Sequence, residues 1–179
     1  RFHLYESLGL KKVVLPVNIF KELGVKVVII TNSSGCLKKG WNIGSFMLIT
    51  STLDFTFQGN VQDPSPVYIR SIEFDELVRK AHTTAEQIGM SLNEGCYTWT
   101  SGPSYETHAE VKKIIELNGN AVGMSTLPEI RESIKENMTA LGIACLTNYA
   151  AGIQKKPLTH HEVVSKASVA EKGLTDLIE

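Results

Sequence analysis

The stretch "VKVVIIT", Val25–Thr31, carries the clearest structural signal in the chain. It is short, apolar and rich in β-branched residues, which is typical of a strand buried on both faces. It leads directly into "TNSSG", residues 31–35, where small polar side chains replace the apolar ones. In α/β sheets, ligands bind beyond the carboxyl ends of such strands. The stretch therefore predicts both a fold class and the edge of the sheet at which to look for a site.

Strand-like and helix-like segments alternate along the rest of the chain. Strands are expected at residues 25–31, 45–50, 95–100, 121–124 and 142–148, and helices at residues 13–23, 74–89 and 106–119, from about 128, and from 159 or 160 onward. This alternation predicts an α/β fold with a mixed, mostly parallel central sheet flanked by helices. Residues 54–71, rich in Pro, Gly, Asn and Gln, are expected to form a mobile surface loop. The length suits a single domain, residues 1–179.

Composition narrows the function classes. Lys and Arg number 18 against 19 Asp and Glu, so no broad basic surface for nucleic acid is expected, although a local cationic pocket stays open. The apolar runs are too short to cross a membrane, and no signal peptide is visible. Three cysteines without metal-like spacing indicate reduced thiols and a cytoplasmic protein. The chain opens on Arg1 rather than Met, so we expect its natural beginning to be missing.

Small hydroxyl, amide and glycine residues follow the predicted strands. The four motifs are "TNSSG" at 31–35, "TSGPSYE" at 100–106, "GMST" at 123–126 and "TNYAAG" at 147–152. Such residues let the backbone approach a polar ligand closely, as phosphate or sugar requires. Within the second motif, Ser104 could be the N-cap of a helix with Glu106 in its first turn. Glu106 could instead direct its charge at a ligand, and the sequence leaves both interpretations open.

Searches for other chemistry find little. The chain has no GxGxxG, GxxxxGK[ST], GxSxG or HExxH motif. His160 and His161 are adjacent on an expected helix and point in different directions, so no metal site is predicted there. None of the cysteines has an evident histidine partner for nucleophilic catalysis.

Five strings occur in a specific order along nearly the whole chain. They are "RFHLYE" at 1–6, "TNSSG", "GPSYET" at 102–107, "VGMST-PE" at 122–129, and "TNYAAGI" with "THHEV" at 147–163. On these strings the chain resembles the trimeric purine nucleoside phosphorylase family, which also includes methylthioadenosine phosphorylases. The resemblance implies a phosphorylase/hydrolase-like fold and phosphorolysis of inosine and guanosine to free base and ribose 1-phosphate in purine salvage. It also implies a homotrimer that needs no cofactor, with inorganic phosphate as co-substrate.

The resemblance assigns roles around phosphate and ribose. Arg1 and His3 would contact phosphate together with the Ser125 hydroxyl and the loop of Ser33, Ser34 and Gly35. Tyr5, Val122, Met124 and His160 would line the nucleoside, with His160 bonded to the ribose 5′-hydroxyl. Each role has a plainer alternative: Arg1 as a disordered terminal residue, Ser125 as an ordinary turn serine and His160 as a residue at a helix start.

The base would be recognised by Tyr105, Glu106 and Asn148. Tyr105 would pack on the purine face, or else be a core aromatic. The Glu106 carboxylate suits N1–H and any 2-amino group of a 6-oxopurine, and the Asn148 amide can donate to N7 or O6. Relatives that act on 6-aminopurines generally carry Asp at the position of Asn148, although Asn is also a common turn residue. The catalytic set expected by resemblance is therefore His3, Glu106 and Asn148.

Two departures from the family keep alternatives open. The family's preceding segment, with a Gly-Ser phosphate loop and a further histidine, has no counterpart in the sequence. Nor can any residue of 54–71 be matched to the aromatic that relatives supply to a neighbouring subunit. A nucleoside-binding homologue without turnover and a methylthioadenosine phosphorylase remain alternatives to the expected activity.

Overall fold

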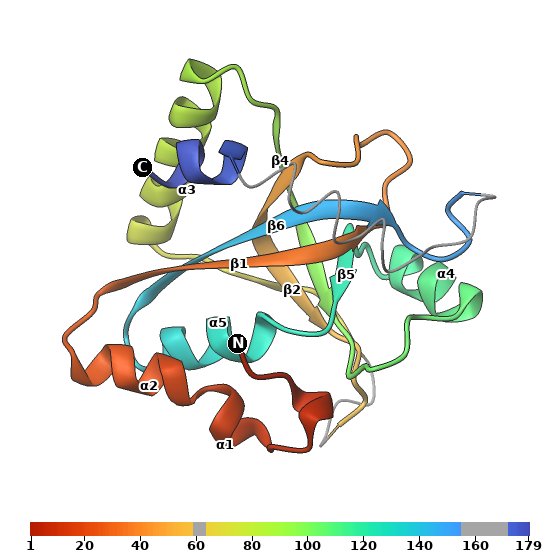
Figure 1. Cartoon of the computed structure of the whole chain (residues 1–179), viewed down its shortest axis with the longest axis horizontal. Helices are drawn as coiled ribbons and strands as arrows, with labels where there is room; N and C mark the ends of the chain where they lie inside the picture. Colours follow the sequence, from red (N-terminus) through yellow and green to blue (C-terminus); the bar gives the residue numbers. More distant parts are fainter. Residues whose placement is uncertain (59–63, 155–171) are drawn as a thin grey trace.

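A computed structural model describes residues 1–58, 64–154 and 172–179 of the chain. In these residues six strands form one sheet in the order β3-β2-β4-β5-β1-β6 (Figure 1). The strands are β1 (Val27–Cys36), β2 (Phe46–Asp54), β3 (Val67–Tyr68), β4 (Leu92–Trp99), β5 (Ala121–Gly123) and β6 (Thr139–Tyr149). Strand β2 also pairs with β6, so the strand pairing closes on itself.

The sheet is mixed, with its longest pairings parallel. Strand β1 runs parallel to β6, and β4 runs parallel to both β2 and β5. The antiparallel pairings are β1 with β5, β2 with β3 and β2 with β6, and each covers four residue pairs or fewer. The prediction of a mixed, mostly parallel sheet flanked by helices is confirmed.

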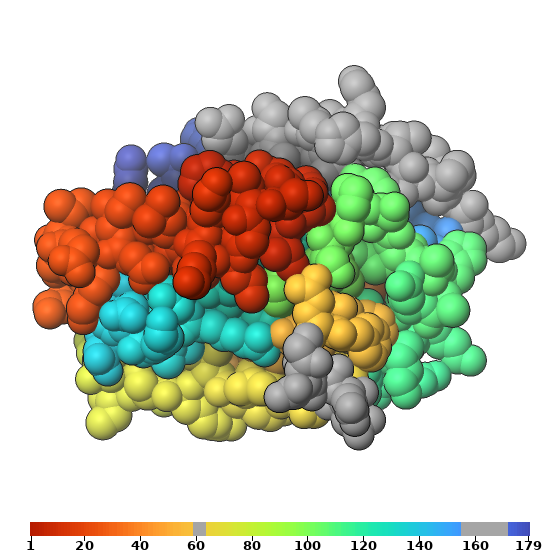
Figure 2. All heavy atoms as spheres, turned by 90° about the horizontal axis from the view of Figure 1, so that it is seen from below, coloured from red at the N-terminus to blue at the C-terminus, as the bar shows by residue number. Residues whose placement is uncertain are grey.

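The helices lie around this sheet in separate groups (Figure 1). Their bounds are η1 (Leu4–Glu6), α1 (Leu10–Val13), α2 (Leu15–Glu22), α3 (Ile72–Gln87), α4 (His108–Glu116) and α5 (Leu127–Lys135), and residues 172–178 are also helical. Helices α1, α2 and α5 lie together on one side, and Figure 2 shows the N-terminal segment packed beside α5 on that face. Helix α3 and the C-terminal helix share the other side, and Leu177 joins their common core. The N-terminus therefore lies beside the start of α5.

Strand β2 shows why the sequence folds this way. Its residues alternate between two cores: Met47 and Ile49 pack in the core shared with α2 and α5, while Phe46 and Leu48 face the core shared with α3. A strand covered on both faces must be apolar at successive positions rather than at every second one. This accounts for the unbroken run "FMLI" at 46–49.

Several predicted boundaries were wrong. Strand β1 continues through "TNSSG" to Cys36, and β6 extends from Thr139 to Tyr149, beyond the expected 142–148, because these two strands pair with each other in parallel register. Tertiary pairing thus overrides the weak strand preference of small polar residues. The helix expected at 13–23 is divided into α1 and α2, and residues 54–71 include strand β3 instead of forming a loop throughout. The expected start of the C-terminal helix, at 159 or 160, lies outside the described residues.

All three cysteines are free and buried. No helix among the described residues is both long enough and apolar enough to span a membrane.

Candidate active site

A cavity of about 340 Å³ lies where the carboxyl ends of β1, β4, β5 and β6 approach one another. Every predicted site residue that the structure describes lines it: Arg1, His3, Tyr5, Ser33, Ser34, Gly35, Tyr105, Glu106, Val122, Met124, Ser125 and Asn148. His160 lies in residues 155–171, outside the described part of the chain. The lining also includes Asn32, Gly123, Thr147, Ala150 and Ala151, which belong to the same strand-end motifs but were not singled out from the sequence.

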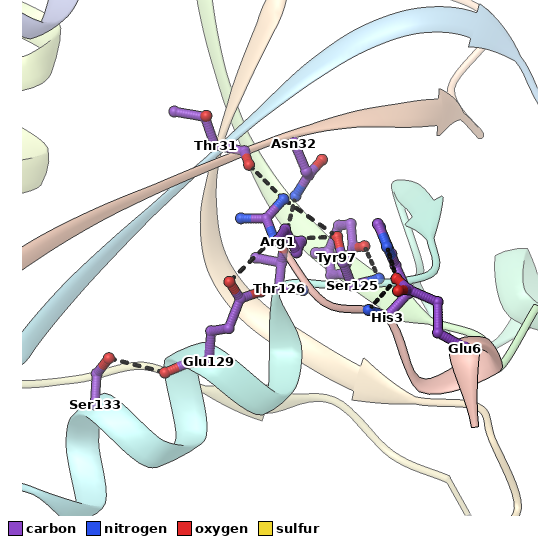
Figure 3. Close-up of polar contacts among 10 residues, drawn as sticks. All are labelled: Arg1, His3, Glu6, Thr31, Asn32, Tyr97, Ser125, Thr126, Glu129 and Ser133. Carbon is purple, nitrogen blue, oxygen red and sulfur yellow. Dashed lines mark hydrogen bonds and ion pairs between the residues drawn. The ribbon is translucent and has the colours of Figure 1, made fainter. Parts of the chain in front are cut away.

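Arg1 belongs to the lining of the cavity and is held by three groups (Figure 3). Its Nη1 donates to the backbone oxygen of Thr31 at 2.7 Å and to Ser125 Oγ at 3.4 Å. Its Nε donates to Glu129 Oε1 at 3.0 Å. The first residue of the chain is therefore fixed against β1 and the start of α5.

The turn between β5 and α5 presents Ser125 to the cavity. Its next residue, Thr126, has φ 73° and ψ −49°, and Leu127 N donates to Ser125 O at 2.8 Å. This combination is the rare γ-turn with positive φ, which is strained, and a β-branched residue is unusual there. The Ser125 amide donates to the Tyr97 hydroxyl at 3.3 Å. Burial raises the pKa of Tyr97 to about 12, so this hydroxyl stays protonated at neutral pH.

A chain of side-chain hydrogen bonds ties this turn to β1. Asn32 Nδ2 donates to Thr126 Oγ1 at 2.8 Å, and Ser34 Oγ donates to Asn32 Oδ1. Ser125 Oγ lies 3.2 Å from Thr126 Oγ1. Four buried or half-buried hydroxyl and amide groups thus support one another next to Arg1. Gly123 is required at the end of β5, because a Cβ there would lie 2.6 Å from the Tyr97 hydroxyl.

His3 and Tyr5 lie next to each other in the lining of the cavity. Their rings stack with centroids 4.8 Å apart. His3 Nδ1 lies 3.0 Å from Glu6 Oε1, which also accepts from the His3 amide at 2.8 Å. Nε2 is then the ring nitrogen that remains for a ligand. Tyr5 and Met124 meet over Gly102, where φ is 65° and a Cβ would lie 2.5 Å from Met124 Sδ.

Glu106 does not belong to the helix that follows it. The N-cap of α4 is Thr107, whose hydroxyl accepts from the Glu110 amide while Glu110 Oε2 accepts from the Thr107 amide at 2.7 Å. The prediction of Ser104 as N-cap was therefore wrong, because the Thr107–Glu110 capping box starts the helix three residues later. Glu106 Oε1 instead accepts from the Thr100 hydroxyl at 2.7 Å. Since a carboxylate has about four acceptor sites, it retains capacity for a ligand.

Asn148 reaches the cavity beside an irregularity in β6. In the β1–β6 register Ser34 lies opposite Leu146 and Gly35 opposite Asn148, so Thr147 is an extra, bulged residue. Bulges redirect side chains and are common beside active sites. Asn148 Oδ1 accepts from Thr147 Oγ1 at 2.9 Å, and its Nδ2 donates to Tyr149 O at 3.1 Å. The amide keeps its second N–H for a ligand.

Tyr105 is 50% exposed, so it is not the core aromatic that the sequence left as an alternative. Partial burial, the negative charge of Glu106 and the neighbouring Tyr5 raise its pKa, in that order of importance. The ring therefore remains neutral at physiological pH at the mouth of the cavity.

Comparison with known proteins identifies the family. The model of the Phosphorylase superfamily matches residues 10–179. The chain belongs to this superfamily. It is 35% identical to purine nucleoside phosphorylase 1 of Bacillus subtilis over 191 residues, covering 100% of this chain and 69% of that protein. It is 38% identical to purine nucleoside phosphorylase 1 of Geobacillus stearothermophilus, covering 92% and 62%. The chain thus spans less than two thirds of the second relative.

Solved structures agree with this assignment. Purine nucleoside phosphorylase of Schistosoma mansoni in complex with adenosine matches with a TM-score of 0.85 and 26% identity, covering 100% of this chain and 71% of the other. The inosine complex of the same enzyme gives a TM-score of 0.86 at 24% identity, which shows a shared fold. The resemblance to purine nucleoside phosphorylases inferred from the sequence is confirmed.

Glu129 and Thr100 are examples of residues that were not predicted from the sequence but contact predicted site residues. Glu129 contacts Arg1, and Thr100 contacts Glu106. Both residues lie at the edges of quoted motifs, so proximity to the motifs was a usable signal. No group of three His, Cys, Asp or Glu residues that could hold a metal ion occurs among residues 1–58, 64–154 and 172–179.

Proposed function

We propose that the protein cleaves the C–N glycosidic bond of 6-oxopurine nucleosides with inorganic phosphate, in purine salvage. The products are the free base and ribose 1-phosphate. The observation that carries this proposal is one cavity lined by a guanidinium, an imidazole and hydroxyl donors, which we assign to an anion end, and by a carboxylate and a carboxamide, which we assign to a base end. Family membership and the names of the relatives support the same reaction class.

The cationic end suits the attacking phosphate. The Arg1 guanidinium, the His3 imidazole and the Ser125 hydroxyl would hold the dianion by charge-assisted hydrogen bonds. A phosphate oxygen attacks C1′ of the ribose, the C1′–N9 bond breaks, and its electron pair leaves with the purine. Because the transition state resembles an oxocarbenium ion, holding phosphate and ribose in line contributes much of the rate. Phosphate is the co-substrate, and no cofactor is proposed.

The opposite end suits the departing base. Asn148 would donate its second amide proton to N7 or O6, where negative charge develops as the bond breaks. Glu106 would accept from N1–H, and from the 2-amino group of guanine. Tyr105 would pack on the purine face, and Tyr5, Val122 and Met124 would line the ribose with His160 at its 5′-hydroxyl. Adenine has no proton on N1, so Glu106 favours inosine and guanosine.

The test is inosine with and without phosphate. We expect hypoxanthine and ribose 1-phosphate in equal amounts, and only when phosphate is present. Equal release of hypoxanthine without phosphate would make the protein a hydrolase. Failure to turn over inosine, together with calorimetric binding of inosine, would favour a nucleoside-binding homologue without turnover.

A substrate series tests the base preference. Inosine and guanosine should exceed adenosine and methylthioadenosine in kcat/KM. Adenosine belongs in the series because the related Schistosoma mansoni enzyme was solved in complex with it. Methylthioadenosine as the preferred substrate would overturn the role proposed for Asn148. We further propose that the protein acts as a cytoplasmic homotrimer, which sedimentation velocity and cell fractionation would check.

A further inference from the structure

Glu129 connects two parts of the anion end with a single carboxylate (Figure 3). Its Oε1 accepts from Arg1 Nε at 3.0 Å, while its Oε2 accepts from the Thr126 amide at 2.9 Å. The side chains of Arg1 and Glu129 are only 24% and 13% exposed, so water screens this pair less than a surface salt bridge. Ordinary N-terminal capping of α5 would need only the contact with Thr126.

The contact with Thr126 falls on the strained residue of the site. A non-glycine residue at positive φ costs on the order of 1–3 kcal/mol and persists only where its surroundings hold it. Here the Thr126 amide is held by Glu129 and its hydroxyl by Asn32. The Ser125–Thr126 turn places Ser125 Oγ 3.4 Å from Arg1 Nη1.

The contact with Arg1 fixes the guanidinium plane. Nε donates to Glu129 and Nη1 to Thr31 O, so two edges of the group are engaged. Nη2 meets no hydrogen-bond acceptor among the described residues. A guanidinium with a fixed plane loses less freedom when it binds an oxyanion than a mobile one.

From this geometry we infer that Glu129 is a positioning residue for phosphate: it locks Arg1 and the Ser125–Thr126 turn into one preformed anion site. The inference rests on the proposed function and names a residue outside the contact set of that function. The inference also predicts the direction in which phosphate affinity changes when the charge of Glu129 is removed. A carboxylate near a phosphate site repels the anion, so simple electrostatics predicts that removing its charge tightens phosphate binding. Positioning predicts weaker binding.

The test compares Glu129→Gln with Glu132→Gln. Glutamine has one acceptor oxygen and one donor nitrogen, so it cannot accept from both Arg1 and Thr126. We expect the KM for phosphate to rise about tenfold, the size of one charge-assisted hydrogen bond, with the KM for inosine unchanged within about twofold. Glu132 lies in the same helix but is paired with Lys135, so Glu132→Gln should leave both constants unchanged. A fall in the phosphate KM, no change, or an equal rise in both constants would overturn the inference.

A double-mutant cycle separates positioning from general stability. If Glu129 acts through Arg1, Glu129→Gln should add little to the phosphate defect of Arg1→Ala. Additive defects would contradict the inference. Should Glu129→Gln fail to fold, Glu129→Asp replaces it, since aspartate keeps the charge but lacks the reach to both partners. A phosphate KM that Glu129→Asp leaves unchanged would then overturn the inference.

Failure of the inference can be told from failure of the proposed function. Wild-type activity that depends on phosphate, with Glu129→Gln equal to Glu132→Gln, rejects only the role of Glu129. Calorimetric titration of inorganic phosphate into each protein gives a second readout without turnover, with about tenfold weaker binding expected for Glu129→Gln. A wild-type protein that neither requires nor binds phosphate rejects both proposals.

Discussion

The two ends of the cavity are built differently. At the anion end the polar groups bond to one another: Ser125 and Thr126 are buried, and Tyr97, Asn32 and Glu129 hold them. At the base end the groups are more exposed and more sparsely held. Among the described residues, the Glu106 side chain contacts Thr100, the Asn148 side chain bonds to its neighbours Thr147 and Tyr149, and Tyr105 is half exposed.

This difference in side-chain contacts indicates how each end of the cavity would bind its ligand. A preformed network holds donors where charge must be neutralised, so little reorganisation is needed when phosphate binds. At the base end, the Glu106 carboxylate and the Asn148 amide keep hydrogen-bonding capacity that a base can use. Substitutions at the base end should therefore change activity without changing stability, whereas those at the anion end should change both.

The largest effect is expected for Asn148→Ala. Removing a donor to developing negative charge typically lowers kcat roughly 100- to 1,000-fold. Its contacts in the structure are with Thr147 and Tyr149, so the melting temperature should change little. Steady-state kinetics on inosine and thermal melts measure both, with Asn18→Ala in α2 as a control. Asn148→Asp should raise the adenosine-to-inosine ratio of kcat/KM, and an unchanged ratio would contradict the proposed role.

Glu106→Gln should have the next largest effect. Loss of a carboxylate that accepts from the base should lower kcat/KM for inosine about 10- to 100-fold. Stability should be unaffected because Thr107 and Glu110, not Glu106, cap α4.

The capping residue provides a matched control for Glu106. Glu110→Gln should lower stability by about 0.5–1 kcal/mol and leave kcat/KM unchanged. The bond from the Thr107 amide lowers the pKa of Glu110, so the stability that its charge contributes is lost as pH falls through the acid range. Lower stability with full activity for Glu106→Gln would reverse the two assignments.

Tyr97→Phe tests the buried support of the anion end. The Ser125 amide would lose its acceptor, which should cost about 1–3 kcal/mol of stability and raise the KM for phosphate. The wild type should also lose stability between about pH 10 and 12. In that window an unfolded tyrosine releases its proton, whereas Tyr97, with a pKa of about 12, keeps it when folded. Denaturant unfolding across this range should show a smaller loss for Tyr97→Phe, and equal losses would refute the assignment.

The sequence predicted the base end and the anion end unequally. Glu106, Asn148 and Tyr105 lie in sequence motifs from which a role in ligand binding could be predicted. The residues that hold the anion end in place could not be predicted in this way. In the sequence, Tyr97 looks like an ordinary strand residue, and Glu129 looks like a carboxylate at the start of a helix after Pro128. Their contacts span 28 and 128 positions of sequence. Only the fold brings such partners together, so periodicity and capping rules could not pair them.

The predicted strand boundaries were wrong for a related physical reason. Ser33, Ser34 and Gly35 have low strand preference, and their sequence suggests a loop after Thr31. In the structure their backbone groups pair with residues 145–148 of β6, which extends both strands into the cavity. Asn148 lies on strand β6, in agreement with the strand expected at 142–148 and not with the alternative of a turn. The sequence thus predicted residues that line the cavity, while long-range pairing decides where each of them lies.

The smallest effect is expected for Thr100→Val, which sharpens the comparison most directly. Valine matches threonine in shape but cannot donate to Glu106, which loses the contact observed at 2.7 Å. We expect kcat/KM for inosine to fall about threefold, within the range of a single hydrogen bond. The change should appear in the KM for the nucleoside and not in that for phosphate, the opposite of Glu129→Gln. Thr100→Ser, which keeps the donor, should restore the wild-type value. If Thr100→Val alters the phosphate KM instead, the two ends are coupled through the Thr100–Gly123 contact at 3.4 Å and do not act independently.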